Sequence, residues 1–359
     1  MKSILLLSDY AAPYRGNFIP SLEAIERHLG KDNKVVYAFP GVAQEQAWMQ
    51  AFEKIHTVVY IDRMFFSKYP QWKILAHLRS VCRQYHITTI HTHFVEGNVN
   101  MWLLRTLSGI QCVANLHNHY KVSGRLGVVR KYLFRWTNDV VIGDSQSVSE
   151  SAYAIGIRRN KVVTINNSID FTRLDNPTPI EVRRETEQVV LMFGYPWYRK
   201  GVDVAVKAIQ QLNEQGMPVR LAIAQSGRVE QTQQGIVQAI CAVPSWVTFL
   251  PPTDRLADYY NACDVFLSAG REEGLSYSPI EAAYCSCGVV CSRIGGNPLD
   301  IPEIGIYPTE DIHALSAVLQ AQLGMSKEEC QHRNAVQRAY VLGNYNVEEW
   351  AERVIETYK

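Results

Sequence analysis

Short apolar runs of strand length alternate along this chain with longer segments in which apolar residues recur at helical spacing. The strand-length runs of the first half are residues 4–8, 34–38, 58–61, 88–91, 112–116, 140–143 and 162–165. Those of the second half are residues 189–193, 220–224, 247–250, 265–268, 288–291 and 305–307. Alternation of this kind predicts βαβ units and parallel sheets.

The alternation is interrupted once, near the middle of the chain. Residues 175–179 are polar and contain two prolines, and residues 181–185 are charged. We predict an α/β chain of two Rossmann-like, doubly wound domains that face each other across a cleft, because 359 residues exceed what one hydrophobic core usually supports. The expected parts are an N-terminal domain at 1–172, a linker at 173–187, a C-terminal domain at 188–342, and a final helix at 343–359 that can cross back to the first domain.

Composition narrows the class of protein. Hydrophobic residues make up 47% and charged residues 20%, and the net charge is +1, so the chain is neither disordered nor basic enough to be a dedicated nucleic-acid binder. The apolar start is too short for a signal peptide, and no run approaches the ~20 apolar residues of a membrane span. We expect a cytoplasmic protein, with peripheral contact at the inner face of the membrane as an open option.

The candidate site of the second half follows the strand that ends near Ser268. Ligands of open parallel sheets bind beyond the carboxyl ends of the strands. Gly274 would let the backbone approach a ligand, and the amides of Leu275 and Ser276 would point outward beside the positive end of a helix dipole, which suits a diphosphate. Glu273 and Glu281 flank this place. The pattern 278–281 is also a capping box, and Glu272 with Glu273 also fits a solvated pair of loop charges.

The same segment resembles the signature of family-four retaining glycosyltransferases (glycosyl transferases group 1, with the GT-B fold). The similarity lies in two glutamates that are separated by seven residues. A glycine follows the first glutamate, and two alanines follow the second. Residues 288–298 look like the strand and Gly-Gly-x-Pro loop that follow in that family, and residues 248–250 and 259–268 match it in order and spacing. The resemblance implies that Glu273 orients the donor sugar and that Glu281 binds the ribose.

The start of the second domain resembles the family with one departure. The family has a Gly-Arg pair and then a Lys-Gly, and here Gly194 and Lys200-Gly201 keep the family spacing while Tyr195 occupies the position of the arginine. The resemblance assigns Lys200 to the departing diphosphate. Arg199 is a candidate for the missing cation, because a guanidinium suits phosphate oxygens. An exposed Arg-Lys pair at a helix start is the alternative.

The first domain resembles the family more loosely. Gly16 lies in a loop after the first strand, where it is a candidate for close approach to the donor diphosphate, although turn geometry explains it equally well. The family's second glycine is Asn17 here. His117 follows a strand and matches the histidine that contacts the donor sugar. His91 and His93 we interpret as structural, since strand alternation points both to one face without a third metal-like ligand.

Together with these residues, the resemblance implies a retaining, metal-independent glycosyltransferase of the hexosyl type. The donor would be a UDP- or GDP-linked sugar, bound as substrate with no further cofactor. The acceptor would be a glycan or lipid-linked saccharide, in cell-surface polysaccharide biosynthesis. No Asp-x-Asp motif that would hold a divalent ion follows a strand, and no residue is assigned as nucleophile or general base.

Two further points stay open. Leu126, Val129, Leu133 and Trp136 recur at helical spacing among Arg130, Lys131 and Arg135, which is compatible with a membrane-surface helix or with ordinary packing on the sheet. The alternatives to a transferase are a nucleotide-sugar epimerase or phosphorylase on the same fold, and a non-catalytic sugar-nucleotide-binding partner of a transferase. A nicotinamide dehydrogenase is disfavoured because no Gly-x-Gly-x-x-Gly follows the first strand.

Overall fold

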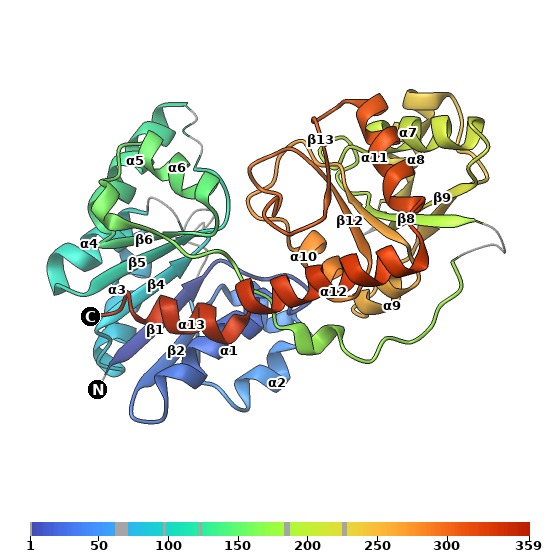
Figure 1. The fold of residues 1–359 in the computed structure, drawn as a ribbon. Coiled ribbons are helices and arrows are strands. Elements are labelled where there is room, and N and C mark those ends of the chain that lie inside the picture. Colours follow the sequence, from blue (N-terminus) through green and yellow to red (C-terminus); the bar gives the residue numbers. More distant parts are fainter. Residues whose placement is uncertain are drawn as a thin grey trace. The chain divides into compact units, whose positions relative to one another are not determined.

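The structure is a computed structural model that describes residues 2–61, 71–95, 98–120, 122, 124–182, 187–224 and 228–359, with Gly124 and Leu126 described by their backbone alone. The chain divides into two compact units (Figure 1). Unit 1 comprises Met1–Asp170 and Val347–Lys359, and unit 2 comprises Phe171–Asn346. Each unit has a sheet and a hydrophobic core of its own.

The described part of unit 1 is built on a seven-stranded parallel sheet with the order β3-β2-β1-β4-β5-β6-β7. The order reverses between β1 and β4, as in a doubly wound Rossmann-like sheet. The strands are β1 (Ser3–Ser8), β2 (Lys34–Phe39), β3 (Val58–Tyr60), β4 (Thr89–His93), β5 (Gln111–Leu116), β6 (Val140–Gly143) and β7 (Val162–Thr164).

Helices cover both faces of this sheet, which explains why its central strands are apolar throughout. Ile4 and Leu6 of β1 belong to a core with α1, α2 and α13, whereas Leu5 and Leu7 pack with α3 and α4. Helices α5 and α6 pack beside β5 and β6. The helices are α1 (Phe18–Leu29), α2 (Met49–Glu53), α3 (Gln71–Gln84), α4 (Val99–Ser108), α5 (Gly124–Thr137), α6 (Gln146–Ala154) and α13 (Val347–Ile355), with short 3-10 turns at Gly41–Glu45 and Arg159–Lys161.

The C-terminal helix α13 is part of unit 1, although it follows unit 2 in the sequence. It packs against α1, and Trp350 is buried in the core that the two helices share. Beyond it, Tyr358 is also buried, and its backbone carbonyl accepts a hydrogen bond of 2.8 Å from the Lys2 ammonium. The segment after α13 therefore packs into the core and is hydrogen-bonded to the residue that precedes β1.

The described part of unit 2 has a six-stranded parallel sheet with the order β10-β9-β8-β11-β12-β13, which reverses between β8 and β11. Its α7, α8 and α11 contribute to one core, and α10 packs against α9 and α12. The elements are β8 (Gln188–Phe193), α7 (Val202–Glu214), β9 (Val219–Ala224), α8 (Val229–Ile240), β10 (Val247–Leu250), α9 (Leu256–Asn261), β11 (Val265–Ser268), α10 (Tyr277–Tyr284), β12 (Gly288–Ser292), β13 (Gly305–Tyr307), α11 (Ile312–Leu323) and α12 (Lys327–Asn344).

The fold class predicted from the sequence is confirmed, since each unit is a doubly wound parallel sheet. Two predicted boundaries lie elsewhere in the structure. Position 342 falls inside α12, which continues to Asn344, and α13 starts at Val347. The start of the predicted linker is packed rather than free: a 3-10 turn at Phe171–Leu174 lies against α9 and α10, and the Asp175 carboxylate accepts a hydrogen bond of 2.6 Å from the Tyr284 hydroxyl. Residues 183–186 lie outside the described residues.

Candidate active site

The candidate site of unit 2 lies where its strand order reverses. β8 and β11 are neighbours there, and their carboxyl ends lead into two loops, residues 194–201 and residues 269–276. We call these the β8 loop and the β11 loop. Parallel strands end at the same edge of a sheet, so the two loops leave that edge together, and a reversal of strand order is where such sheets hold their ligands.

Lys200 and Glu273 meet between these loops. The Lys200 ammonium lies 2.6 Å from the Glu273 carboxylate, which is only 11% exposed. Arg199 is 46% exposed, and its guanidinium is 3.5 Å from the same carboxylate. The structure thus brings three of the predicted residues together. Lys200 is held closely, whereas Arg199 is held by a long contact that contributes little in solvent.

Gly201 makes the meeting of the loops sterically possible. Its backbone is left-handed, with φ +69°, and a Cβ atom there would lie 2.1 Å from the carbonyl oxygen of Ala269 at the start of the β11 loop. The Lys200 amide also donates a hydrogen bond of 2.9 Å to the Pro196 carbonyl, which closes the β8 loop into a turn. A glycine after Lys200 is therefore required for the β8 loop to touch the β11 loop.

Arg271 ties the same two loops together, and no motif in the sequence marked it. Its amide donates a hydrogen bond of 2.9 Å to the Arg199 carbonyl. Its guanidinium lies 3.9 Å from the centre of the Tyr198 ring and 2.8 Å from the Asp203 carboxylate on α7. Hydrogen bonding to Asp203 raises the pKa of Arg271 above its usual range, so this cation belongs to the scaffold.

One predicted phosphate donor is already used inside the protein. The Ser276 amide donates a hydrogen bond of 2.7 Å to the carbonyl of Gly296, so in this conformation it does not point outward to a ligand. Gly296 lies so close that a Cβ atom there would be 2.0 Å from the backbone oxygen of Glu273. The Gly-Gly-x-Pro loop thus packs onto the β11 loop, and the Leu275 amide remains the candidate donor. Gly274, which is buried, lies between Glu273 and Leu275.

Glu281 has a different local role from the capping box that residues 278–281 suggest. Helix α10 starts at Tyr277 after the cap residue Ser276, so Ser278 is already helical and that box cannot form. The Glu281 side chain is buried and accepts a hydrogen bond of 2.8 Å from the Tyr260 hydroxyl. The Arg173 guanidinium pairs with its other oxygen. Burial and the neighbouring carboxylate raise the pKa of Tyr260 well above its usual value.

His117 lies in unit 1, directly after β5, within a network of buried polar groups. Its Nδ1 atom is 2.7 Å from the Asp144 carboxylate, and its Nε2 atom is 3.0 Å from Nδ1 of His93. Asp144 is fully buried and also accepts a hydrogen bond of 2.8 Å from the Asn167 amide. Because a carboxylate only accepts, the neutral His117 ring carries its proton on Nδ1, and Nε2 then accepts from His93.

His91 and His93 share one face of β4, as strand alternation predicts, with ring centres 4.3 Å apart. Nδ1 of His91 lies 2.7 Å from the Tyr358 hydroxyl. Burial, followed by the neighbouring His117, lowers the pKa of His91 to about 3, and burial also lowers that of His93 well below its usual value. Both rings are therefore neutral near pH 7, and His93 sets the hydrogen bonding of His117. The sequence interpretation of His93 as merely structural missed this contact.

Gly16 lies in the loop between β1 and α1 and has a left-handed backbone with φ +54°. The Tyr10 hydroxyl donates a hydrogen bond of 2.8 Å to the Tyr14 carbonyl within the same loop. The turn geometry that the sequence offered as one explanation of Gly16 is thus present. Contact with a donor stays a prediction.

A second residue that the sequence did not single out is Arg228, which precedes α8. Its guanidinium donates a hydrogen bond of 3.0 Å to the Tyr195 hydroxyl. Tyr195 is the position at which the chain departs from the family pattern. Arg228 belongs to no motif, because the contact joins residues that are 33 positions apart.

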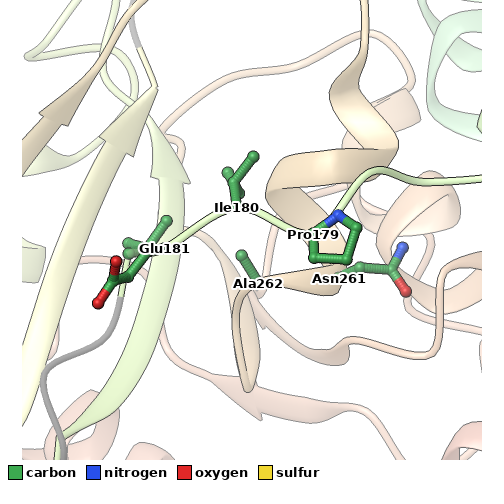
Figure 2. Close-up of a pocket in the computed structure, with 6 residues that line it drawn as sticks. Pro179, Ile180, Glu181, Asn261 and Ala262 are labelled. Atoms are coloured by element: carbon green, nitrogen blue, oxygen red, sulfur yellow. The ribbon is translucent and has the colours of Figure 1, made fainter.

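A hollow of about 490 Å³ in unit 2 is lined by other residues (Figure 2). The segment from Pro179 to Glu181 runs past the end of α9, where Asn261 and Ala262 lie. None of the predicted site residues lines it, so this hollow is separate from the candidate site. Within the described ranges, no group of three or more His, Cys, Asp or Glu side chains is placed to hold a metal ion.

Two parallel, doubly wound units in one chain define the GT-B class of fold, and comparison with solved structures agrees. The Anabaena protein HepE, solved in complex with UDP and glucose, superposes with a TM-score of 0.78 at 18% identity, over 99% of each chain. A glycosyltransferase from Rickettsia africae gives a TM-score of 0.84 at 14% identity, over 100% of this chain and 98% of its own.

Sequence comparison identifies the family. The profile of glycosyl transferases group 1 matches residues 187–323, and the profile of glycosyltransferase family 4 matches residues 25–173. The chain belongs to the family-four, group 1 glycosyltransferases.

Two individual relatives share about a quarter of the aligned residues with this chain. D-inositol 3-phosphate glycosyltransferase 2 of Catenulispora acidiphila is 27% identical over 236 residues, which cover 58% of this chain and 55% of the relative. The chain thus spans little more than half the length of this relative. A phosphatidylinositol N-acetylglucosaminyltransferase subunit of Arabidopsis thaliana is 22% identical over 92% of this chain and 77% of its own.

The contact at Gly201 predicts that Gly201→Ala destabilises unit 2 by about 2 to 4 kcal/mol, from a left-handed alanine and a clash with the Ala269 carbonyl. Gly216→Ala is the matched control, because Gly216 has φ +85° and nothing within 4 Å of its added Cβ. Urea unfolding of the two variants measures the difference. Equal losses would show that the close approach of the loops does not depend on Gly201.

The network around His117 predicts its tautomer. Long-range ¹H–¹⁵N spectra near pH 7 should show neutral His117 protonated on Nδ1, and Asp144→Asn should abolish that preference because an amide can donate as well as accept. The control is Asp32→Asn in an exposed turn. A wild-type His117 protonated on Nε2 alone would contradict the assignment.

Proposed function

We propose that this chain is a retaining, metal-independent glycosyltransferase that moves a hexosyl group from a nucleoside-diphosphate sugar to a glycan or lipid-linked saccharide. The observation that carries the proposal is the meeting of Lys200, Arg199 and Glu273 at the strand-order reversal of unit 2. The β8 and β11 loops thereby present two cations and one carboxylate at the edge where such sheets bind ligands.

Breaking the bond between sugar and diphosphate develops negative charge on the leaving group, and stabilising that charge usually contributes most to catalysis. Lys200 and Arg199 supply cations for it, and the Leu275 amide supplies a neutral donor. In this proposal they take the place that a divalent ion holds in metal-dependent transferases. Glu273 holds Lys200 before the donor arrives, and with the donor bound it is free to accept hydrogen bonds from sugar hydroxyls.

Retention of configuration is proposed to proceed by attack on the same face of the sugar, without a protein nucleophile. Positive charge then develops at the anomeric carbon as its bond to the diphosphate breaks. The acceptor hydroxyl forms the new bond to this carbon and passes its proton to the departing diphosphate. Glu273 suits an orienting role better than a nucleophilic one, because its carboxylate pairs with Lys200 at 2.6 Å. Glu281, which Arg173 and Tyr260 hold in place, is proposed to bind the ribose. In unit 1, His117 and Gly16 are proposed to contact the donor.

The donor and acceptor are proposed from chemistry that relatives share. UDP is the first donor nucleotide to test, since the Anabaena protein HepE was solved with UDP-glucose, and GDP is the second. Relatives named for inositol phosphate and phosphatidylinositol favour a polar or lipid-linked acceptor. We place the activity in cell-surface polysaccharide biosynthesis.

Contact with the inner face of the membrane is proposed through α5. The exposed apolar and aromatic side chains described on this helix are Val128, Val129, Tyr132 and Trp136. Leu133 of the predicted stripe is half-buried, and the Leu126 side chain lies outside the described residues. The helix carries arginines and a lysine and no acidic residue. Aromatic and cationic side chains on one helix suit an anionic lipid surface. No described helix is both long and apolar enough to cross a bilayer.

The site predicts that Lys200→Ala and Glu273→Ala each lower the rate of donor turnover by roughly 10²- to 10³-fold, the usual effect of losing a preorganised group that stabilises charge. Turnover is followed as nucleoside diphosphate released from labelled UDP- and GDP-sugars. Lys207→Ala on α7 and Glu272→Ala in the β11 loop are the matched controls. Wild-type protein without transfer or hydrolysis would favour a non-catalytic binding partner, and an epimerised donor would favour an epimerase.

The α5 surface predicts binding to vesicles that contain anionic lipid, at low salt. Tyr132→Ser with Trp136→Ser should weaken sedimentation with these vesicles at least tenfold, because burial of two aromatic side chains is lost. Ile55→Ser, at a residue that is 73% exposed after α2, is the control. Wild-type protein that binds neutral and anionic vesicles equally weakly would rule out this surface.

A further inference from the structure

The guanidinium of Arg228, in unit 2, is held by a neutral partner. This guanidinium donates to the Tyr195 hydroxyl at 3.0 Å and lies 5.7 Å from the centre of the Tyr195 ring. No carboxylate of the described residues forms an ion pair with it, and the residue is exposed. Its charge is therefore held in place without being neutralised.

The backbone at Arg228 is itself constrained. Its φ of 58° and ψ of 47° are left-handed, a conformation that is strained for a residue other than glycine. The conformation persists because the start of α8 is fixed to the β8 loop. The Thr232 hydroxyl donates a hydrogen bond of 3.1 Å to the Gly194 carbonyl, and Gly235 is packed against the Trp197 ring.

These contacts bring Arg228 to the loop that carries Arg199 and Lys200. Tyr195 directly precedes Pro196, whose carbonyl accepts the hydrogen bond from the Lys200 amide that closes the turn. Three cations therefore belong to one structural group, and Glu273 is the carboxylate that pairs with two of them. A group with this excess of positive charge favours an anion with several oxygens.

We propose that Arg228, positioned by Tyr195, binds the diphosphate of the nucleotide donor and of the released nucleoside diphosphate. The inference rests on the proposed function, because it assigns a further binding residue to the same site. Arg228 contributes a planar pair of N–H donors, and Tyr195 sets its direction from the opposite side. Arg199, which is 46% exposed at 3.5 Å from Glu273, is then an auxiliary cation and not the principal partner of Lys200.

The experiment compares binding of UDP and UMP, and of GDP and GMP, by isothermal titration calorimetry. Arg228→Ala should weaken nucleoside diphosphate binding by about tenfold or more, because a charge-assisted hydrogen bond is lost, and should change monophosphate binding much less. The diphosphate affinity of Arg228→Lys should lie between those of the wild-type protein and Arg228→Ala, since lysine keeps the charge and loses the planar fork. Tyr195→Phe should give a smaller loss than Arg228→Ala. Lys327→Ala, an exposed cation at the start of α12, is the control.

A double variant tests the position and not only the charge. Tyr195→Arg with Arg228→Ala returns a guanidinium to the same place and should recover diphosphate binding, with thermal unfolding showing that each variant is folded. Unchanged diphosphate affinity in Arg228→Ala, alongside a loss in Lys200→Ala, would overturn the role of Arg228 and leave the proposed function standing. A folded double variant that does not recover diphosphate binding would overturn the proposed position of the guanidinium beside the β8 loop. Failure of wild-type protein to bind any nucleoside diphosphate would instead overturn the proposed function.

Discussion

The candidate site of unit 2 depends on the close approach of two backbone loops beyond β8 and β11. A Cβ atom added to Gly201 would lie 2.1 Å from the carbonyl oxygen of Ala269. A Cβ atom added to Gly296 would lie 2.0 Å from the carbonyl oxygen of Glu273. Without that approach, Lys200 and Glu273 would belong to separate surface loops, where an ion pair contributes little. With it, the carboxylate is largely shielded from water and fixes the lysine. The two glycines thus determine the electrostatics of the site although they carry no charge.

A second constraint is that buried charges must have partners, and each unit satisfies it. In unit 1 Asp144 is surrounded by His117 and Asn167, and in unit 2 Glu281 is paired with Arg173 and Tyr260. Removing one partner of such a group costs more than the pair contributes, because an uncompensated charge remains. Any ligand that displaces Arg173 from Glu281 must therefore replace this contact with contacts of its own.

The sequence predicted the strands because parallel strands covered on both faces are continuous apolar runs, as β1 and β8 show. It also predicted Lys200 and Glu273 as site residues, because both follow predicted strands and match the pattern of the family that the chain resembles. It did not predict the use of the Ser276 amide, the pairing of Glu281 with Arg173, or the contact of Arg228 with Tyr195. Each of these joins residues distant in the chain, and only the packing of turns and helices decides it. Arg173 could not be recognised as a site residue from the sequence for a further reason, because its segment has the polar composition of a linker.

In unit 2 a carboxylate holds Lys200, whereas a hydroxyl holds Arg228. These two partners have different chemical consequences. A lysine held by a carboxylate keeps two further N–H donors, but the neighbouring negative charge offsets part of its attraction for a phosphate. A guanidinium held by a hydroxyl keeps its partner, because an arginine has five N–H donors and Tyr195 uses one of them. Its field at the ligand is also not cancelled by a neighbouring negative charge. A tyrosine beside an arginine therefore gives a preorganised cation, whereas Glu273 makes the response of Lys200 depend on what the carboxylate binds next.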